Sequence, residues 1–415
     1  SNNTAIGFNA MLANTTGASN TAVGSSAGAA ITTGQGNSIL GYLAADATTT
    51  GGDNTAMGYK ALTTNTTGSY NVAIGKDALE NATTASNNTA VGFKSLEANT
   101  TGDLNVAVGR ETMLSNTTGS ENSAVGRNAL RNNTTGANNT AMGSLAGHNN
   151  TTASNNTSVG YKALYVNTTG TENTVVGAFA GDALTTGSLN TFIGFNAATA
   201  GVVTGSENVA IGNAAAGPLT SGASNVCVGP DAGSGLTTGS NNLFLGHDAG
   251  RTGSPGGNQT TGNNSIVLGD ENIGDAYIQV DWTVASDQRD KTDFTALDLG
   301  LDFVKALAPV TYKWDKRSKY GDKTANDYDL AAQTPDGTHK EDWLDIGFKA
   351  QEVEALEIAA GYNKSSKTNL VSSHTSDGKQ MGLQYSKFVP ILVKAIQEQN
   401  ALIESLTARI TTLEG

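Results

Sequence analysis

Residues Asn54 to Tyr70 read NTAMGYKALTTNTTGSY, and this unit decides the fold of the first two thirds of the chain. It opens on the motif Asn-x-x-(Val/Ile/Met/Leu)-Gly, which recurs at spacings of 17 residues with one extra residue before the thirteenth copy. The copies begin at Asn3, Asn20, Asn37, Asn54, Asn71, Asn88, Asn105, Asn122, Asn139, Asn156, Asn173, Asn190, Asn208, Asn225 and Asn242. A degenerate copy follows at Asn263–Gly269. A fixed period of this length is typical of a solenoid, in which each repeat packs on its neighbours.

The order of residue types inside one unit indicates strands and turns. Thr55–Met57 is short, apolar and suited to a strand, and Gly58 ends it. A second apolar pair, Ala61–Leu62, follows, and Asn65–Gly68 has the composition of a turn. A helix needs apolar residues three and four apart over a longer stretch, which this unit never supplies. We therefore predict two short strands per repeat and a mainly β shaft, a β-roll or solenoid, over residues 1–269.

The apolar pattern also predicts a partner for the shaft. Adjacent strand residues such as Ala56 and Met57 point to opposite faces. One of them can fill the core of the roll, whereas the other needs a second buried environment. Two further copies of the chain around a three-fold axis would supply it, so we expect a trimeric shaft. Units such as Asn20–Gly24 resemble the head repeats of trimeric autotransporter adhesins and repeats in phage tail fibres.

Composition argues against several classes of function. The net charge is −13 and no basic stripe is present, so nucleic acid is not an expected partner. No apolar run is long enough to span a bilayer, so membrane insertion is not expected. Calcium-binding β-rolls need Asp at fixed places in every repeat, whereas Asp is sporadic here, and neither a metal nor a cofactor is expected. The single cysteine, Cys227, is predicted to be a buried small side chain.

The composition changes near Asp270, beyond which all three tryptophans lie. Residues 270–285 are predicted to form a linker and cleavage junction, and residues 286–386 a small α+β domain. The expected elements are a linking strand over Asp275–Val284 with Tyr277, Ile278, Val280 and Trp282, a helix over Leu297–Leu307, a strand over Val310–Trp314 and a helix near Glu352–Leu356.

A final helix is predicted over Lys387–Leu413, within a coiled-coil segment at residues 387–415. It carries a heptad seam with alternating spacings of four and three: Leu392, Ile396, Gln399, Ile403, Leu406, Ile410 and Leu413. Such spacing winds helices into a left-handed coiled coil. Because the seam reaches the end of the chain, we expect it to form a trimeric coiled coil. The alternative is a single amphipathic helix packed on its own domain.

Four blocks in this region resemble the C-terminal intramolecular chaperone domain of phage tailspikes, tail fibres and endosialidases. They are Ser286-Asp287-x-Arg289-x-Lys291, Pro309-Val310-x-Tyr312-x-Trp314, Ile346-Gly347-Phe348-x-Ala350-Gln351-Glu352-Val353, and Tyr385 through Ala395–Asn400. The resemblance implies a domain that trimerises the chain, helps the upstream β structure to fold and then cuts itself off.

The resemblance also implies residue roles. The cut would fall between Ala285 and Ser286, with Ser286 as nucleophile and Lys291 as general base. Asp287 and Arg289 would orient the pair or balance its charge. The family motif has leucine where this chain has Asp290, and a carboxylate there would stabilise the ammonium form of Lys291 and oppose the base role. Self-cleavage, a single-turnover reaction, therefore stays open.

The leading hypothesis is a virion-attached, extracellular phage fibre that binds a host surface receptor, either a glycan or an outer-surface protein. One alternative is a bacterial surface adhesin of the autotransporter type, although that class ends in a membrane domain. Another is the distal part of a polysaccharide-degrading tailspike, which would need paired carboxylates in a cleft that thin coils do not provide. Regular repeats are typical of a spacer, which leaves Gly253–Trp282 as a candidate receptor-binding surface.

Overall fold

The structure, a computed structural model, describes residues 2–199, 201–279, 282, 284–323, 327–365, 368, 370–375 and 377–415. The chain divides into two compact units. The first, called the shaft unit, comprises Ser1–Arg251 and Gln259–Gly269. The second, called the C-terminal unit, comprises Thr252–Asn258 and Asp270–Gly415. The insertion Thr252–Asn258 therefore groups with the C-terminal unit although repeat sequence flanks it on both sides.

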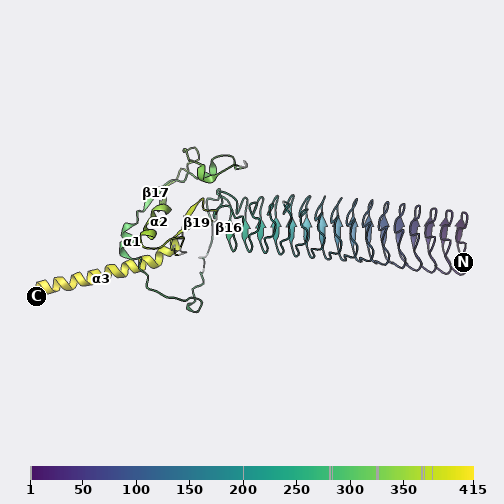
Figure 1. Ribbon diagram of the computed structural model, residues 1–415, viewed down its shortest axis with the longest axis horizontal. Helices are drawn as coiled ribbons and strands as arrows, with labels where there is room; N and C mark the ends of the chain where they lie inside the picture. Colours follow the sequence, from purple (N-terminus) through teal and green to yellow (C-terminus); the bar gives the residue numbers. More distant parts are fainter. Residues whose placement is uncertain are drawn as a thin grey trace. The chain divides into compact units, whose positions relative to one another are not determined.

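The shaft unit is a stack of coils, each of which adds one strand to a single parallel sheet (Figure 1). Neighbouring coils pair in register, so that Ala56 lies beside Ala73 and Met57 beside Ile74. The strands in the described part of this unit are β1 (Thr4–Ile6), β2 (Thr21–Val23), β3 (Ser38–Leu40), β4 (Thr55–Met57), β5 (Val72–Ile74), β6 (Thr89–Val91), β7 (Val106–Val108), β8 (Ser123–Val125), β9 (Thr140–Met142), β10 (Thr157–Val159), β11 (Thr174–Val176), β12 (Thr191–Ile193), β13 (Val209–Ile211), β14 (Val226–Val228), β15 (Leu243–Leu245) and β16 (Ile266–Leu268). The prediction of a mainly β solenoid with a short repeat is confirmed.

The prediction of two strands per coil is wrong, because the second apolar pair lies in a compact turn. Lys60 and Leu62 have φ angles of 55° and 57°, and alternate left-handed residues cannot continue a strand. The turn leaves Leu62 fully buried. Its hydrogen bonds still join the coils, since the N–H of Lys60 donates to Tyr42 O at 3.0 Å and that of Leu62 to Ala78 O at 2.9 Å.

Buried asparagines tie each coil to the next. The backbone N–H of Asn71 donates to Asn54 Oδ1 at 3.0 Å, and Asn71 Nδ2 donates to Ala85 O at 2.8 Å. Asn88 repeats both contacts one coil further on, so the polar groups of the ladder satisfy one another. Asn99, which opens an Asn-Thr-Thr triplet, is also fully buried and donates to Gly102 O at 2.9 Å. Its amide is therefore part of a turn inside the coil.

Cys227 lies in the middle of β14, and its side chain is fully buried in the core of the shaft unit. Burial raises the pKa of its thiol to about 12. The thiolate is the reactive form of cysteine, so this residue acts as a small apolar side chain, as predicted.

The C-terminal unit is a small α+β fold around an apolar core that includes Phe303, Val353, Val371, Phe388 and Ile391. In the described residues its elements are α1 (Leu301–Ala306), α2 (Ala350–Ala359), α3 (Phe388–Glu414), the antiparallel pair β17 (Val310–Tyr312) and β18 (Asp345–Gly347), and the antiparallel pair β19 (Ser372–His374) and β20 (Met381–Leu383). Short 3-10 helices span Gln288–Asp290, Arg317–Lys319, Leu330–Ala332 and Tyr385–Lys387.

Two predicted elements of this unit differ from the structure. The described residues of 275–284 form no strand, and Tyr277 and Trp282 are 93 % and 71 % exposed, so their alternating pattern meets no partner strand. Val280 lies outside the described residues. The helix expected from Leu297 begins only at Leu301, whose backbone N–H donates to Glu398 Oε2 at 2.7 Å. A carboxylate from α3 therefore caps α1.

Candidate functional site

The predicted serine and lysine lie on either side of a single helical turn. The short helix Gln288–Asp290 is capped by Asp287, whose Oδ1 accepts from the N–H of Arg289 at 2.9 Å. This turn brings Lys291 Nζ to 2.5 Å from Ser286 Oγ and to 3.3 Å from Ser286 O. The structure therefore places the two residues of the predicted pair in direct hydrogen-bond contact.

An ion pair fixes the outside of the same turn. Arg289 Nη2 lies 2.6 Å from Asp287 Oδ2, and Arg289 Nε lies 3.1 Å from the same oxygen. The hydrogen bonds from Arg289 lower the pKa of Asp287, and the Asp287 carboxylate raises the pKa of Arg289. Both side chains are exposed, so the pair orients the turn more than it stabilises the fold.

Asp290 does not interrupt the contact between Ser286 and Lys291. Within the part of the chain that the structure describes, no ion pair joins Asp290 to Lys291, and the Lys291 ammonium group is directed to Ser286 instead. A general base must be neutral, and burial or nearby positive charge favours that form. Ser286 and Lys291 are both exposed in the single chain, so enclosure of the pair would have to come from other residues or other copies.

The seam of α3 is exposed along its whole length. Phe388, Ile391 and Ala395 are buried against their own unit, whereas every residue from Asn400 to the end of the helix is exposed. Six apolar seam residues have exposed fractions between 43 % and 85 %: Leu392, Ile396, Ile403, Leu406, Ile410 and Leu413. The polar seam residue Gln399 is exposed as well. Only the first turns of α3 therefore have residues buried against the rest of the C-terminal unit.

Sequence reasoning missed Glu357, a buried carboxylate in α2. It accepts hydrogen bonds from the N–H groups of Leu370 at 2.8 Å, Val371 at 2.5 Å and Ser372 at 3.0 Å, and one from the Ser372 hydroxyl. Burial raises its pKa, but these four hydrogen bonds outweigh that effect and leave the pKa below its usual value. Its position four residues after Val353 on the buried face of α2 was the available signal.

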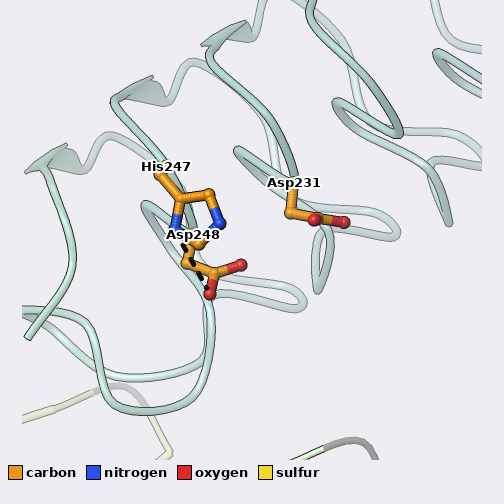
Figure 2. A group of neighbouring side chains, drawn as sticks. All are labelled: Asp231, His247 and Asp248. Atoms are coloured by element: carbon orange, nitrogen blue, oxygen red, sulfur yellow. Dashed lines mark ion pairs between the residues drawn. The ribbon is translucent and has the colours of Figure 1, made fainter. Parts of the chain in front are cut away.

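Two clusters of side chains on the shaft unit have metal-binding residue types. Figure 2 shows Asp231, His247 and Asp248, whose potential ligand atoms lie within 4.8 Å of one another. His247 Nδ1 lies 3.6 Å from Asp248 Oδ2, and Arg251 Nη1 lies 2.9 Å from Asp248 Oδ1. A guanidinium group of the protein therefore already balances one of the two carboxylates.

The second cluster consists of Asp77, Glu80 and Glu97. Lys60 Nζ lies 3.0 Å from Glu80, and Lys94 Nζ lies 2.8 Å from Glu97. Protein ammonium groups hold these carboxylates in place, and we assign no metal to either cluster.

The comparisons with known proteins bear on the C-terminal unit. The family model described as "Chaperone of endosialidase" matches residues 286–362, a stretch that begins at Ser286 and includes α1, α2, β17 and β18. No curated protein and no solved structure was found to match the chain. Among the described residues, no helix combines the length and the hydrophobicity needed to cross a bilayer. The chain thus has a β-solenoid shaft unit followed by a segment similar to the chaperone of endosialidase.

Proposed function

We propose that the chain is the fibre of a phage tail, a tail fibre or tailspike-like protein that attaches the virion to a host surface receptor. The observation that carries this proposal is the order of its parts, with a long β-solenoid preceding a chaperone-of-endosialidase segment and an exposed helical seam. The C-terminal segment acts as an intramolecular chaperone that gathers three copies before their shafts form. The receptor is a glycan or an outer-surface protein, and the site of action is extracellular.

An apolar stripe along the shaft unit supports association of three copies. From β2 to β16 the middle residue of each strand is buried, and the third residue lies on the opposite face, where Ile6 is 59 % exposed and Met142 50 %. In all sixteen described strands of the shaft unit this third residue is apolar: Ile6, Val23, Leu40, Met57, Ile74, Val91, Val108, Val125, Met142, Val159, Val176, Ile193, Ile211, Val228, Leu245 and Leu268. Each of these residues is exposed or half-buried, and a continuous apolar stripe on a surface is typical of an interface.

Replacing Ile403 by Asp in the middle of the seam is expected to abolish trimer formation. Three carboxylates would meet inside an apolar coiled coil, where like charges are unfavourable. Size-exclusion chromatography with multi-angle light scattering measures the result. Ser405→Asp, which adds the same charge two residues away on an exposed and non-seam position, is the control and is expected to stay trimeric. A wild-type protein that is monomeric would contradict the fibre proposal.

We also propose that the Ser286–Lys291 pair performs one self-cleavage. Lys291 takes the hydroxyl proton, and Ser286 Oγ attacks the carbonyl carbon of Ala285. The Ala285–Ser286 amide bond breaks as its nitrogen gains a proton, which leaves an ester that water hydrolyses. The contact of 2.5 Å between Lys291 Nζ and Ser286 Oγ supports this role.

Freshly expressed wild-type protein is therefore expected to give two fragments that break between Ala285 and Ser286 in a mass spectrum. Ser286→Ala is expected to remain one chain of 42.2 kDa, since the attacking oxygen is lost. Thr292→Ala, a hydroxyl removed next to Lys291, is the matched control and is expected to be cut like the wild type. An uncut wild-type chain would contradict self-cleavage and would leave the trimer proposal standing.

A further inference from the structure

The C-terminal unit contains residues from both sides of the Ala285–Ser286 bond. Thr252–Asn258 and the residues from Asp270 to Ala285 precede the bond, and the rest of the unit follows it. We propose that Glu271 and Asn258 join these two sides in a noncovalent clasp, so that cutting the bond leaves the C-terminal part attached. The inference rests on the proposed self-cleavage for its biological meaning, although the contacts themselves do not depend on it.

Glu271 forms the centre of the clasp. Its side chain is only 5 % exposed and makes an ion pair with Lys323. Lys316 Nζ donates to the backbone carbonyl of Glu271 at 3.0 Å, and Lys319 Nζ donates to Asn272 Oδ1. Three lysines that follow the Ala285–Ser286 bond therefore converge on two consecutive residues that precede it. Glu271 and Asn272 follow β16 by only a few residues. The clasp therefore acts at the end of the solenoid sequence.

Close packing surrounds this carboxylate. A Cβ atom added to Gly253 would lie 3.0 Å from both Glu271 Oε2 and Ser318 Cβ. Ser318, in the middle of the short helix Arg317–Lys319, is 2 % exposed, and Ser254 is fully buried. The insertion Thr252–Asn258, Glu271 and this helix thus pack without room for a methyl group. Glu271 is thus largely shielded from water, whereas its partner Lys323 is 28 % exposed, and a partly buried pair is screened by salt less than a fully exposed one.

A second contact joins the insertion to the end of β19 and the loop after it. Asp377 Oδ2 accepts from the backbone N–H of Asn258 at 3.1 Å. Its other oxygen accepts from Thr375 Oγ1 at 2.5 Å and from the N–H of Lys379 at 3.0 Å. The loop is therefore shaped around a carboxylate that reaches across to the insertion.

Release of the C-terminal part would separate these partners. Release therefore costs the ion pair between Glu271 and Lys323, the hydrogen bonds of Lys316 and Lys319 and the close packing against Ser318. After the bond is cut, the clasp holds the C-terminal part as a cap. Neutralising Glu271 removes the ion pair with Lys323 at the centre of the clasp, whereas the hydrogen bonds of Lys316 and Lys319 go to neutral oxygen atoms and do not depend on the charge.

The test separates the clasp from self-cleavage. A site-specific protease recognition sequence is inserted between Ala285 and Ser286 in full-length Ser286→Ala protein, which is cut after purification and run on a size-exclusion column. The two fragments are expected to elute together. In the same protein carrying Glu271→Gln they are expected to separate, with at least a tenfold drop in the co-eluting fraction. Asp275→Asn, an exposed acid in the same stretch, is the matched control and should behave as the parent.

Lys323→Gln removes the partner from the other side and is expected to release the fragments as Glu271→Gln does, which keeps the test decisive should one variant fail to fold. Thermal unfolding of the uncut variants checks folding. Fragments that separate in the parent protein, or that stay together in both the Glu271 and Lys323 variants, would overturn the clasp. Failure of the natural sequence to cut itself would contradict only the proposed self-cleavage.

Discussion

Replacing Gly92 by alanine is expected to destabilise the shaft unit by on the order of 3 kcal/mol or more, because the strain of a forbidden backbone adds to a steric clash. Gly92 follows β6 with a φ of 134°, where side chains are rarely tolerated, and a Cβ there would lie 2.3 Å from Gly109 O. That oxygen belongs to the backbone of the next coil, so it cannot move aside without breaking the stack. Urea unfolding and amide hydrogen exchange around β6 and β7 measure the loss.

Gly217→Ala is the control for this substitution. Its nearest obstacle is Ala214 O at 3.3 Å, and it does not have a positive φ. The same place in other coils holds Glu80 or Arg131, so a side chain fits there. A change of less than about 1 kcal/mol is expected for this variant. Equal effects of the two substitutions would show that the stacked glycines do not set the coil geometry.

The fold of the shaft unit could be predicted because its signal is repeated. The strand position that Ala56 occupies recurs at the same place in every copy of the repeat, so the period and the stacking of equivalent strands follow from the alignment of copies. The turn around Leu62 could not be predicted in the same way. Its apolar residues resemble a strand, and only the left-handed φ angles of Lys60 and Leu62 distinguish it. Those angles arise from stacking between coils, which local propensity does not contain.

In the C-terminal unit, too, contacts between residues close in the sequence could be predicted, whereas contacts between distant residues could not. Ser286 and Lys291 are five residues apart on one turn, so their contact follows from local sequence once the turn is assumed. Glu271 and Lys323 are far apart in the sequence, and a charge pattern alone cannot pair them. The linking strand over 275–284 fails for a related reason. Alternation predicts a strand only where a neighbouring strand is available to accept its hydrogen bonds.

Replacing Glu357 by alanine is expected to destabilise the C-terminal unit by about 4 kcal/mol, because several buried donors lose their acceptor and each unsatisfied group costs roughly 1–3 kcal/mol. The N–H groups of Leu370, Val371 and Ser372 and the Ser372 hydroxyl would all lose their acceptor in a buried place. A small unit cannot absorb such a loss easily, so we expect partial unfolding at 37 °C and a poor yield of assembled shaft. Far-ultraviolet circular dichroism and light scattering measure the two effects.

The contribution of the Glu357 carboxylate to the free energy of unfolding is expected to depend on pH. The pKa of Glu357 is lower in the folded unit than its unfolded value of about 4.3, so its stabilising contribution is fully present above that value. The contribution is lost as the pH falls through the lower, folded pKa. The difference in unfolding free energy between the wild type and Glu357→Gln is therefore expected to be constant near neutral pH and to shrink below about pH 4. Glu352→Gln, an exposed acid on the same helix, is expected to show no such dependence. A wild-type advantage over Glu357→Gln that persisted unchanged into strong acid would mean that shape, and not the charge of the carboxylate, holds α2 against β19.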